Sequence, residues 1–215
     1  MLILLTFTTG VVDAVSFLGL GHVFVANMTG NVAFLGFALA GGSDVDAPGS
    51  LVSLAFFLVG GAWGGRLARK LASGPPRIWL GRVAGLEVAC FLLSGIAASI
   101  WDQESRLLLL ALGAVAMGLR NATVMKLGDP DFKTTVLTLT ITGLAMNSRF
   151  AGGEDPRWAR RLVAVFALFA GGAVGTALLL GFGLAVPLFF MAAGVAGATA
   201  LYVGHPSSAE APATR

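Results

Sequence analysis

The feature that most constrains this chain is a series of apolar blocks, each of roughly the 20 residues that a helix needs to cross a bilayer. Six blocks are uninterrupted, at residues 2–20, 51–69, 78–101, 106–126, 161–182 and 184–203. Two more, 22–42 and 132–148, carry polar residues at their centres. Hydrocarbon tolerates only helices or closed barrels, and runs of this length suit helices. We therefore expect an all-α integral membrane protein whose main partner is the lipid bilayer.

The charged residues support this expectation. They make up 12% of the chain, against about 25% in soluble domains. The net charge of +3 comes from Lys and Arg in short loops beside the apolar blocks, where they act as topology signals. A nucleic-acid partner is therefore not expected.

The sequence also argues against several kinds of chemistry. His22, His205 and the single Cys90 are isolated, and there is no phosphate-binding loop, Cys/His cluster or nucleophile motif. We expect no metal site, no cofactor and no enzymatic activity. The first block lacks a basic start and contains Asp13, which predicts a retained helix rather than a signal peptide. One transmembrane domain over 1–204 and a disordered tail over 205–215 are predicted.

The two halves of the chain resemble each other. Three matches occur in the same order: Gly10–Ala14 with Gly118–Ala122, Asn27–Asn31 with Val136–Thr140, and Val59–Gly64 with Ala170–Gly175. Each match is weak alone, but the shared order predicts two tandem repeats, over 1–101 and 106–203. The glycines of the third match fit close helix packing.

The loop charges distinguish two topologies. If all eight blocks cross, the basic loop around Arg157 lies opposite the basic loop around Arg69, against the positive-inside tendency. If blocks 22–42 and 132–148 are broken and re-entrant, six full spans remain and both basic loops face the cytoplasm. The second repeat is then inverted relative to the first. The charges favour six spans plus two broken segments, and eight transmembrane helices remain the alternative.

The polar centres of the two interrupted blocks are candidate binding segments. A chain that leaves helical geometry inside the bilayer must pass its backbone groups to protein or to a water-filled cavity. Gly30 permits such a break, and the side chains of Asn27, Thr29 and Asn31 can replace backbone partners. Thr138 and Thr140 occupy the matching segment of the second half. The alternative is that these side chains only bond to helical carbonyls or join helices.

Asp13 is the first candidate ionisable residue. Together with Thr6, Thr9 and Ser16 it forms one polar stripe on one helix face. A charged Asp at the centre of a span costs roughly 2.5–3.5 kcal/mol, so it needs a partner, a cavity or a bound proton. Its repeat mate is Asn121.

Two further charged residues lie within apolar blocks. Arg120, beside Asn121, is the expected counter-ion of Asp13. Glu87 is the third candidate, either in a functional role or in a structural pair with Arg82 or Arg120.

Two motifs carry a family resemblance. The stretch GVVDAVSFLGLGHVFVANMTGNVAFLGFALA and the later GLRNATVMKLG, followed by a Thr-rich segment, closely resemble the two signatures of the YoaK family of bacterial membrane proteins. The resemblance spans nearly the whole chain and implies a bacterial inner-membrane protein, sometimes described as a small permease, with no established substrate. The second motif reads Thr138-Leu139-Thr140 where the family has Thr-Gly-Thr, so a symmetric site is not implied.

These observations lead to three hypotheses. The first is a small secondary transporter or channel for an unidentified solute or ion, with Asp13 as proton or cation carrier where the two broken segments meet near mid-membrane. The second is a membrane scaffold or partner subunit without transport, and the third, disfavoured, is a membrane-embedded enzyme using Asp13 and Glu87. Six spans with glycine ladders also suit association with further copies of the chain.

Overall fold

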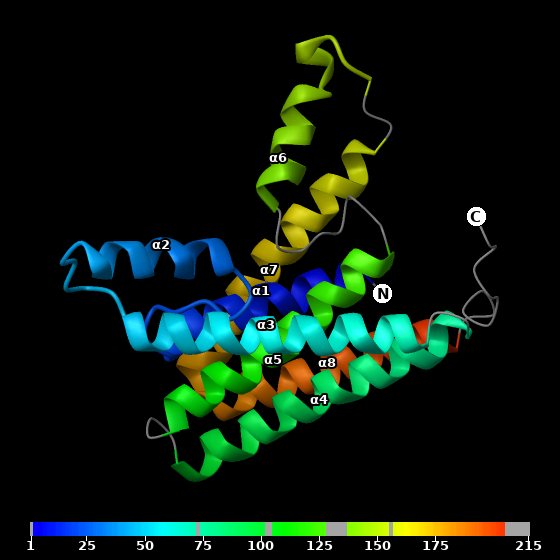
Figure 1. Ribbon diagram of the computed structural model, residues 1–215. Coiled ribbons are helices and arrows are strands. Elements are labelled where there is room, and N and C mark those ends of the chain that lie inside the picture. Colours follow the sequence, from blue (N-terminus) through cyan, green and yellow to red (C-terminus); the bar gives the residue numbers. More distant parts are fainter. Residues whose placement is uncertain (1, 72–73, 102–104, 128–136, 155–156, 205–215) are drawn as a thin grey trace.

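The computed structural model describes residues 2–71, 74–101, 105–127, 137–154 and 157–204 (Figure 1). These residues form helices joined by turns and loops, and the described part of the chain contains no strand. The α-helices are α1 (Leu2–Gly19), α2 (Met28–Leu39), α3 (Ala47–Lys70), α4 (Pro76–Trp101), α5 (Arg106–Leu127), α6 (Leu137–Met146), α7 (Trp158–Phe182) and α8 (Ala185–Val203). A short 3-10 helix covers Arg149–Ala151. The expected all-α architecture is confirmed, and the predicted tail 205–215 lies outside the described residues.

The helices fall into two length classes. Within the described residues, six are long and apolar enough to cross a membrane: α1, α3, α4, α5, α7 and α8. The other two, α2 and α6, have 12 and 10 residues, about 18 and 15 Å at 1.5 Å per residue. A bilayer core of about 30 Å is too thick for either to cross alone.

Close contacts show which long helices run in the same direction. The neighbouring positions are Phe7 with Gly171 and Val11 with Gly175 between α1 and α7, and Val115 with Gly60 and Leu119 with Gly64 between α3 and α5. Residue numbers rise together in both pairs, so α1 is parallel to α7 and α3 is parallel to α5. Arg120, near the end of α5, bonds to Leu5, near the start of α1. The two pairs therefore run in opposite directions.

This arrangement gives the bundle a basic end and an acidic end. We call the basic end the one at which α1, α4 and α7 begin and α3, α5 and α8 end. Its charged side chains include Arg66, Arg69, Lys70, Arg77, Lys126, Arg157, Arg160 and Arg161, whereas Asp44 and Asp46 lie at the opposite, acidic end. Because α1 ends and α3 begins at the acidic end, the chain through α2 returns to the end that it left.

Glycine allows the parallel pairs to pack closely. A Cβ added at Gly60 would collide with the carbonyl oxygen of Val115, and one added at Gly171 with that of Phe7. Interfaces of this kind are common between transmembrane helices, because small residues let the backbones approach. The remaining core is aliphatic and aromatic, with Phe91 and Met191 fully buried at its centre.

The break in the first interrupted block lies earlier than predicted. Helix α2 begins at Met28, so Thr29, Gly30 and Asn31 form its first turn instead of the break. The chain leaves helical geometry in the preceding segment, where Gly21 and His22 have φ values of 88° and 61°. The predicted break at Gly30 is therefore replaced by an earlier non-helical segment followed by one short helix.

Candidate functional site

The most buried charged groups form an ion pair between α4 and α5. Arg120 and Glu87 are 1% and 3% exposed. Arg120 donates from Nε to Glu87 Oε1 at 2.7 Å, and its Nη2 donates to the same oxygen. The pair confirms one of the two structural partners considered for Glu87, whereas Arg82 lies on the exposed side of α4.

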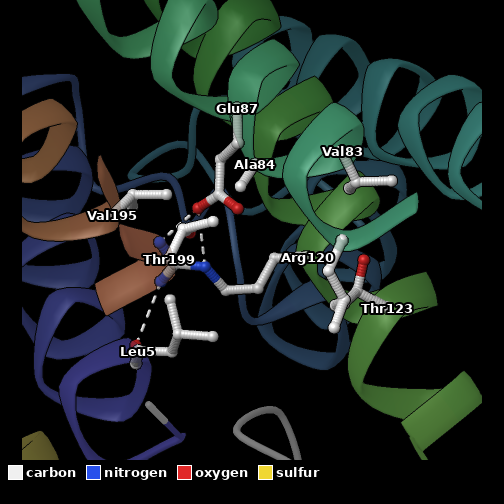
Figure 2. A pocket seen from close by; sticks show the side chains of 9 residues that line it. Leu5, Val83, Ala84, Glu87, Arg120, Thr123, Val195 and Thr199 are labelled. Carbon is white, nitrogen blue, oxygen red and sulfur yellow. Dashed lines mark hydrogen bonds and ion pairs between the residues drawn. The ribbon is translucent and has the colours of Figure 1, made fainter. Parts of the chain in front are cut away.

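The other end of the guanidinium reaches α1. Arg120 Nη1 donates to Thr9 Oγ1 at 2.9 Å and to the Leu5 carbonyl oxygen at 3.1 Å. Thr9 donates in turn to the same carbonyl at 2.8 Å. One guanidinium therefore joins three helices, and most of its five N–H donors have partners (Figure 2).

Asp13 lies one helical turn after Thr9 on the same side of α1. Its Oδ1 is buried and has no hydrogen-bond partner among the described residues. The guanidinium bonds to Glu87, and no bond between Arg120 and Asp13 is described, so the expected role of Arg120 as the counter-ion of Asp13 stays a prediction. Glu87 lies on α4, which packs closely on α5, and this proximity could not be read from spacing along the chain.

The polar stripe of α1 is buried, as its helical spacing predicted. Thr6, Thr9 and Ser16 are at most 2% exposed. Each hydroxyl also bonds to a carbonyl of its own helix; for Ser16 this is the Asp13 backbone at 3.3 Å. These bonds satisfy the hydroxyls inside the bilayer, which agrees with the structural alternative for isolated Thr and Ser.

Asn31 anchors the non-helical segment before α2. Its side chain accepts from Phe24 N at 3.0 Å and donates to Phe24 O at 2.5 Å. Ser53 of α3 also donates to Phe24 O, at 2.6 Å. Asn31 thus takes the place of backbone partners, while Asn27 and Thr29 are exposed.

The second interrupted block is described only from Leu137 onward, and Thr134 and Thr135 fall outside the described residues. Thr140 is buried and Thr138 is exposed on α6. Helix α2 packs on α3 and α6 packs on α7. Thr29 and Thr138 are both exposed, and among the described residues neither has a hydrogen bond to Asp13. Roles for these threonines in binding remain predictions.

Two residues important for this geometry were not singled out for the site from the sequence. Thr9 was noted only as part of the stripe, yet it connects Arg120 to α1. Arg106 pairs with Asp46 and donates to the Leu20 carbonyl at 3.3 Å, which ties the non-helical segment to the start of α5. Asn121, the repeat mate of Asp13, is half-buried beside Arg120 and has an interaction of its own.

The chemistry of the cluster is that of charge and hydrogen bonding. Among the described residues, no group of three His, Cys, Asp or Glu side chains lies close enough to hold a metal ion. What the three charged groups can do is exchange a proton or accept a cation within the membrane span.

Comparison with known proteins gives a family but no activity. Residues 1–202 match the family model described as "Protein of unknown function (DUF1275)". The chain is 33% identical over 147 residues to the UPF0700 transmembrane protein YoaK of Bacillus subtilis (strain 168). That alignment covers 67% of this chain and 64% of the relative. No solved structure matches the chain.

Proposed function

The chain belongs to the DUF1275 family of proteins of unknown function, and from that premise we propose that it is a small secondary transporter or channel. Its site lies near mid-membrane, with Asp13 as the carrier of a proton or cation. The observation that supports this most is the buried Oδ1 of Asp13, which has no hydrogen-bond partner among the described residues. An ionisable residue inside a transmembrane span is costly and by default marks an ion or proton pathway.

The charges of Asp13, Glu87 and Arg120 favour a positively charged transported species. Asp13 and Glu87 bring two negative charges when ionised, and Arg120 brings one positive charge. The cluster therefore lacks one positive charge, and an isolated buried charge is expensive. A proton or a monovalent cation taken up at Asp13 makes the cluster neutral, whereas an anion would add to the imbalance.

Matching glycine contacts between the long helices support transport as the proposed class of function. Gly118 lies against Phe57 O and Gly61 N, and Gly10 lies against Leu168 O and Gly172 N. Gly60 of α3 lies against Val115 O of α5, and the matching Gly171 of α7 lies against Phe7 O of α1. Each half thus supplies the same contacts to the other with the direction of the helices reversed. Inverted repeats of this kind are common in secondary transporters, whose sites lie at the repeat interface.

The proposal includes a location. A transmembrane relative from a bacterium and six apolar helices support a multi-pass protein of the bacterial inner membrane. The positive-inside rule places the basic end in the cytoplasm.

The decisive experiment uses purified protein reconstituted in lipid vesicles that contain a pH-sensitive dye. A pH gradient is imposed with potassium and valinomycin present to compensate charge, first without solute and then with a panel of small polar solutes, amines and alkali cations. We expect proton movement, alone or with one solute class, that Asp13→Asn abolishes. Ser16→Ala is the matched control, because it removes a hydroxyl one turn away and no charge. Undiminished gradient-driven flux through Asp13→Asn would exclude the carrier role.

A second candidate function is favoured by the tight packing around the cluster. The cavity beside the ion pair has a volume of only about 20 Å³, which suits a scaffold or partner subunit without transport. Vesicles that show no flux for any probe, together with copurification of a membrane partner, would support it. We propose no enzymatic role, because Glu87 is held by Arg120 and is not paired with Asp13 for acid–base chemistry.

A further inference from the structure

A small cavity lies directly against the buried ion pair. It is lined by side chains of four helices, α1, α4, α5 and α8 (Figure 2). Its walls are mostly aliphatic, from residues such as Leu5, Leu80 and Val195, but Glu87, Arg120, Thr123 and Thr199 also line it. Polar groups from three of the helices therefore face one small space.

The size of the cavity fits one water molecule. A buried water needs roughly 10–15 Å³ of such volume and two to four polar partners. The cavity has about 20 Å³, so it exceeds this minimum.

The polar partners are also present. All hydrogen bonds that the structure describes for Glu87 end on Oε1, which leaves Oε2 able to accept. Arg120 Nη2 has two hydrogens and one described bond. Within the described part of the chain, the hydroxyl of Thr199 has no hydrogen bond, and that of Thr123 donates to Leu119 O at 3.0 Å and can still accept. A water here would have at least three partners.

We propose that this cavity holds one water molecule and that it is the entry by which protons from the basic end reach Glu87. Thr123 and Thr199 each lie four residues before the end of their helix, about 6 Å inside the basic end at 1.5 Å per residue. The Glu87 backbone lies 11 residues after the start of α4, about 16 Å inside. The hydroxyls thus lie between the basic end and the carboxylate.

The consequence for the site rests on the proposed function. A proton passes from the water to Glu87 Oε2, and the water regains one from the basic end. Protonation removes the negative charge that holds Arg120, the charged group that faces Glu87 from α5. When the proton passes on to Asp13, one turn beyond Thr9 along α1, Glu87 regains its negative charge and its bonds with Arg120, and Asp13 becomes neutral. Glu87 therefore receives the proton from the basic end, whereas Asp13 is the carrier. The two carboxylates thus have separate roles.

The water itself is tested by solid-state NMR on the protein in bilayers, with isotopically labelled glutamate and magnetisation transferred from water. We expect transfer to the Glu87 carboxyl carbon, assigned by its loss in Glu87→Gln. Ala84→Leu fills the cavity and should abolish the transfer. Ala89→Leu, an equal change on the exposed side of the same helix, should leave it intact. No transfer in the wild type, or transfer unaffected by Ala84→Leu, overturns the proposal.

Thr199→Val keeps the shape of the side chain and removes the hydroxyl, so it tests the site without filling it. We expect weaker water transfer to Glu87 and slower proton entry when the acid side of the gradient faces the basic end. Unchanged transfer and unchanged entry would contradict the role of the hydroxyl. If water reaches Glu87 but Asp13→Asn leaves flux intact, the proposed carrier fails and the water site stands. If Asp13→Asn abolishes flux but no water reaches Glu87, the water site alone fails.

Discussion

The adjacent glycines of α3 provide a sharp test of the close helix packing. A Cβ at Gly60 would collide with the backbone carbonyl of Val115, whereas one at Gly61 would meet only Gly118 O, at 4.0 Å. Gly60→Ala and Gly61→Ala therefore make the same chemical change on neighbouring positions of one helix. Only the first forces α3 and α5 apart.

The expected magnitudes follow from two terms. Replacing Gly by Ala within a helix stabilises it by about 1 kcal/mol, and this term is common to both variants. Overpacking typically costs about 1–3 kcal/mol, and here the obstacle is backbone that cannot rotate away. Gly60→Ala should thus be less stable than Gly61→Ala by about 1–3 kcal/mol, with Gly61→Ala neutral or stabilising.

The measurement is the free energy of unfolding in mixed micelles as the denaturing detergent is increased, followed by circular dichroism. Gly171→Ala and Gly172→Ala repeat the comparison between α7 and α1, since a Cβ at Gly172 has its nearest neighbour at 3.9 Å. Equal stabilities within either pair would refute the packing argument. A difference in α3 with none in α7 would refute the equivalence of the two halves.

The remaining predictions concern the ion pair, the anchored segment and the topology. Glu87→Ala should destabilise the protein by about 3–5 kcal/mol because it leaves Arg120 buried and unpaired, and the double variant Glu87→Leu/Arg120→Met should recover most of this loss in the same unfolding assay. Asn31→Ala should cost about 1–3 kcal/mol for each Phe24 backbone group left unsatisfied, whereas Asn27→Ala, at an exposed position without a described cap bond, should change stability little; equal effects would contradict the anchoring role. In a Cys90→Ala background, Asp44→Cys and Gly153→Cys should react with membrane-impermeant thiol reagents from opposite sides, and labelling from the same side would contradict six spans.

The helices were predictable because their signal is local. A run of about 20 apolar residues is sufficient evidence for a span, and six of the expected blocks became α1, α3, α4, α5, α7 and α8. The loop charges alone also favoured a common basic end. The start of α2 was misplaced because Gly30 permits a break without requiring one, while the hydrogen bonds that define the real break join Phe24 to Asn31 and Ser53 across the fold.

For the buried ion pair, the sequence indicated the participating residues but not their pairing. Burial of Asp13 and Arg120 followed from their place within apolar blocks, but the choice of partner did not. Arg120 can reach any helix beside α5, and α4 and α1 both contribute acceptors. Which carboxylate pairs with Arg120 depends on side-chain length and on how the helices pack. Neither can be deduced from the spacing of residues along one helix.

The asymmetry of the cluster would give the proposed transport a direction. The glycine contacts are the same in both halves, but the repeat mate of Asp13 is Asn121, and by the same alignment the mate of Arg120 is Val12. A symmetric bundle would offer the same charge from either end of the membrane. By helix rise Glu87 and Asp13 lie at the same depth, 11 residues from the starts of α4 and α1, but of the two only Glu87 lines the proposed water cavity. In the proposed mechanism a proton that enters from the basic end through this cavity therefore meets Glu87 before Asp13.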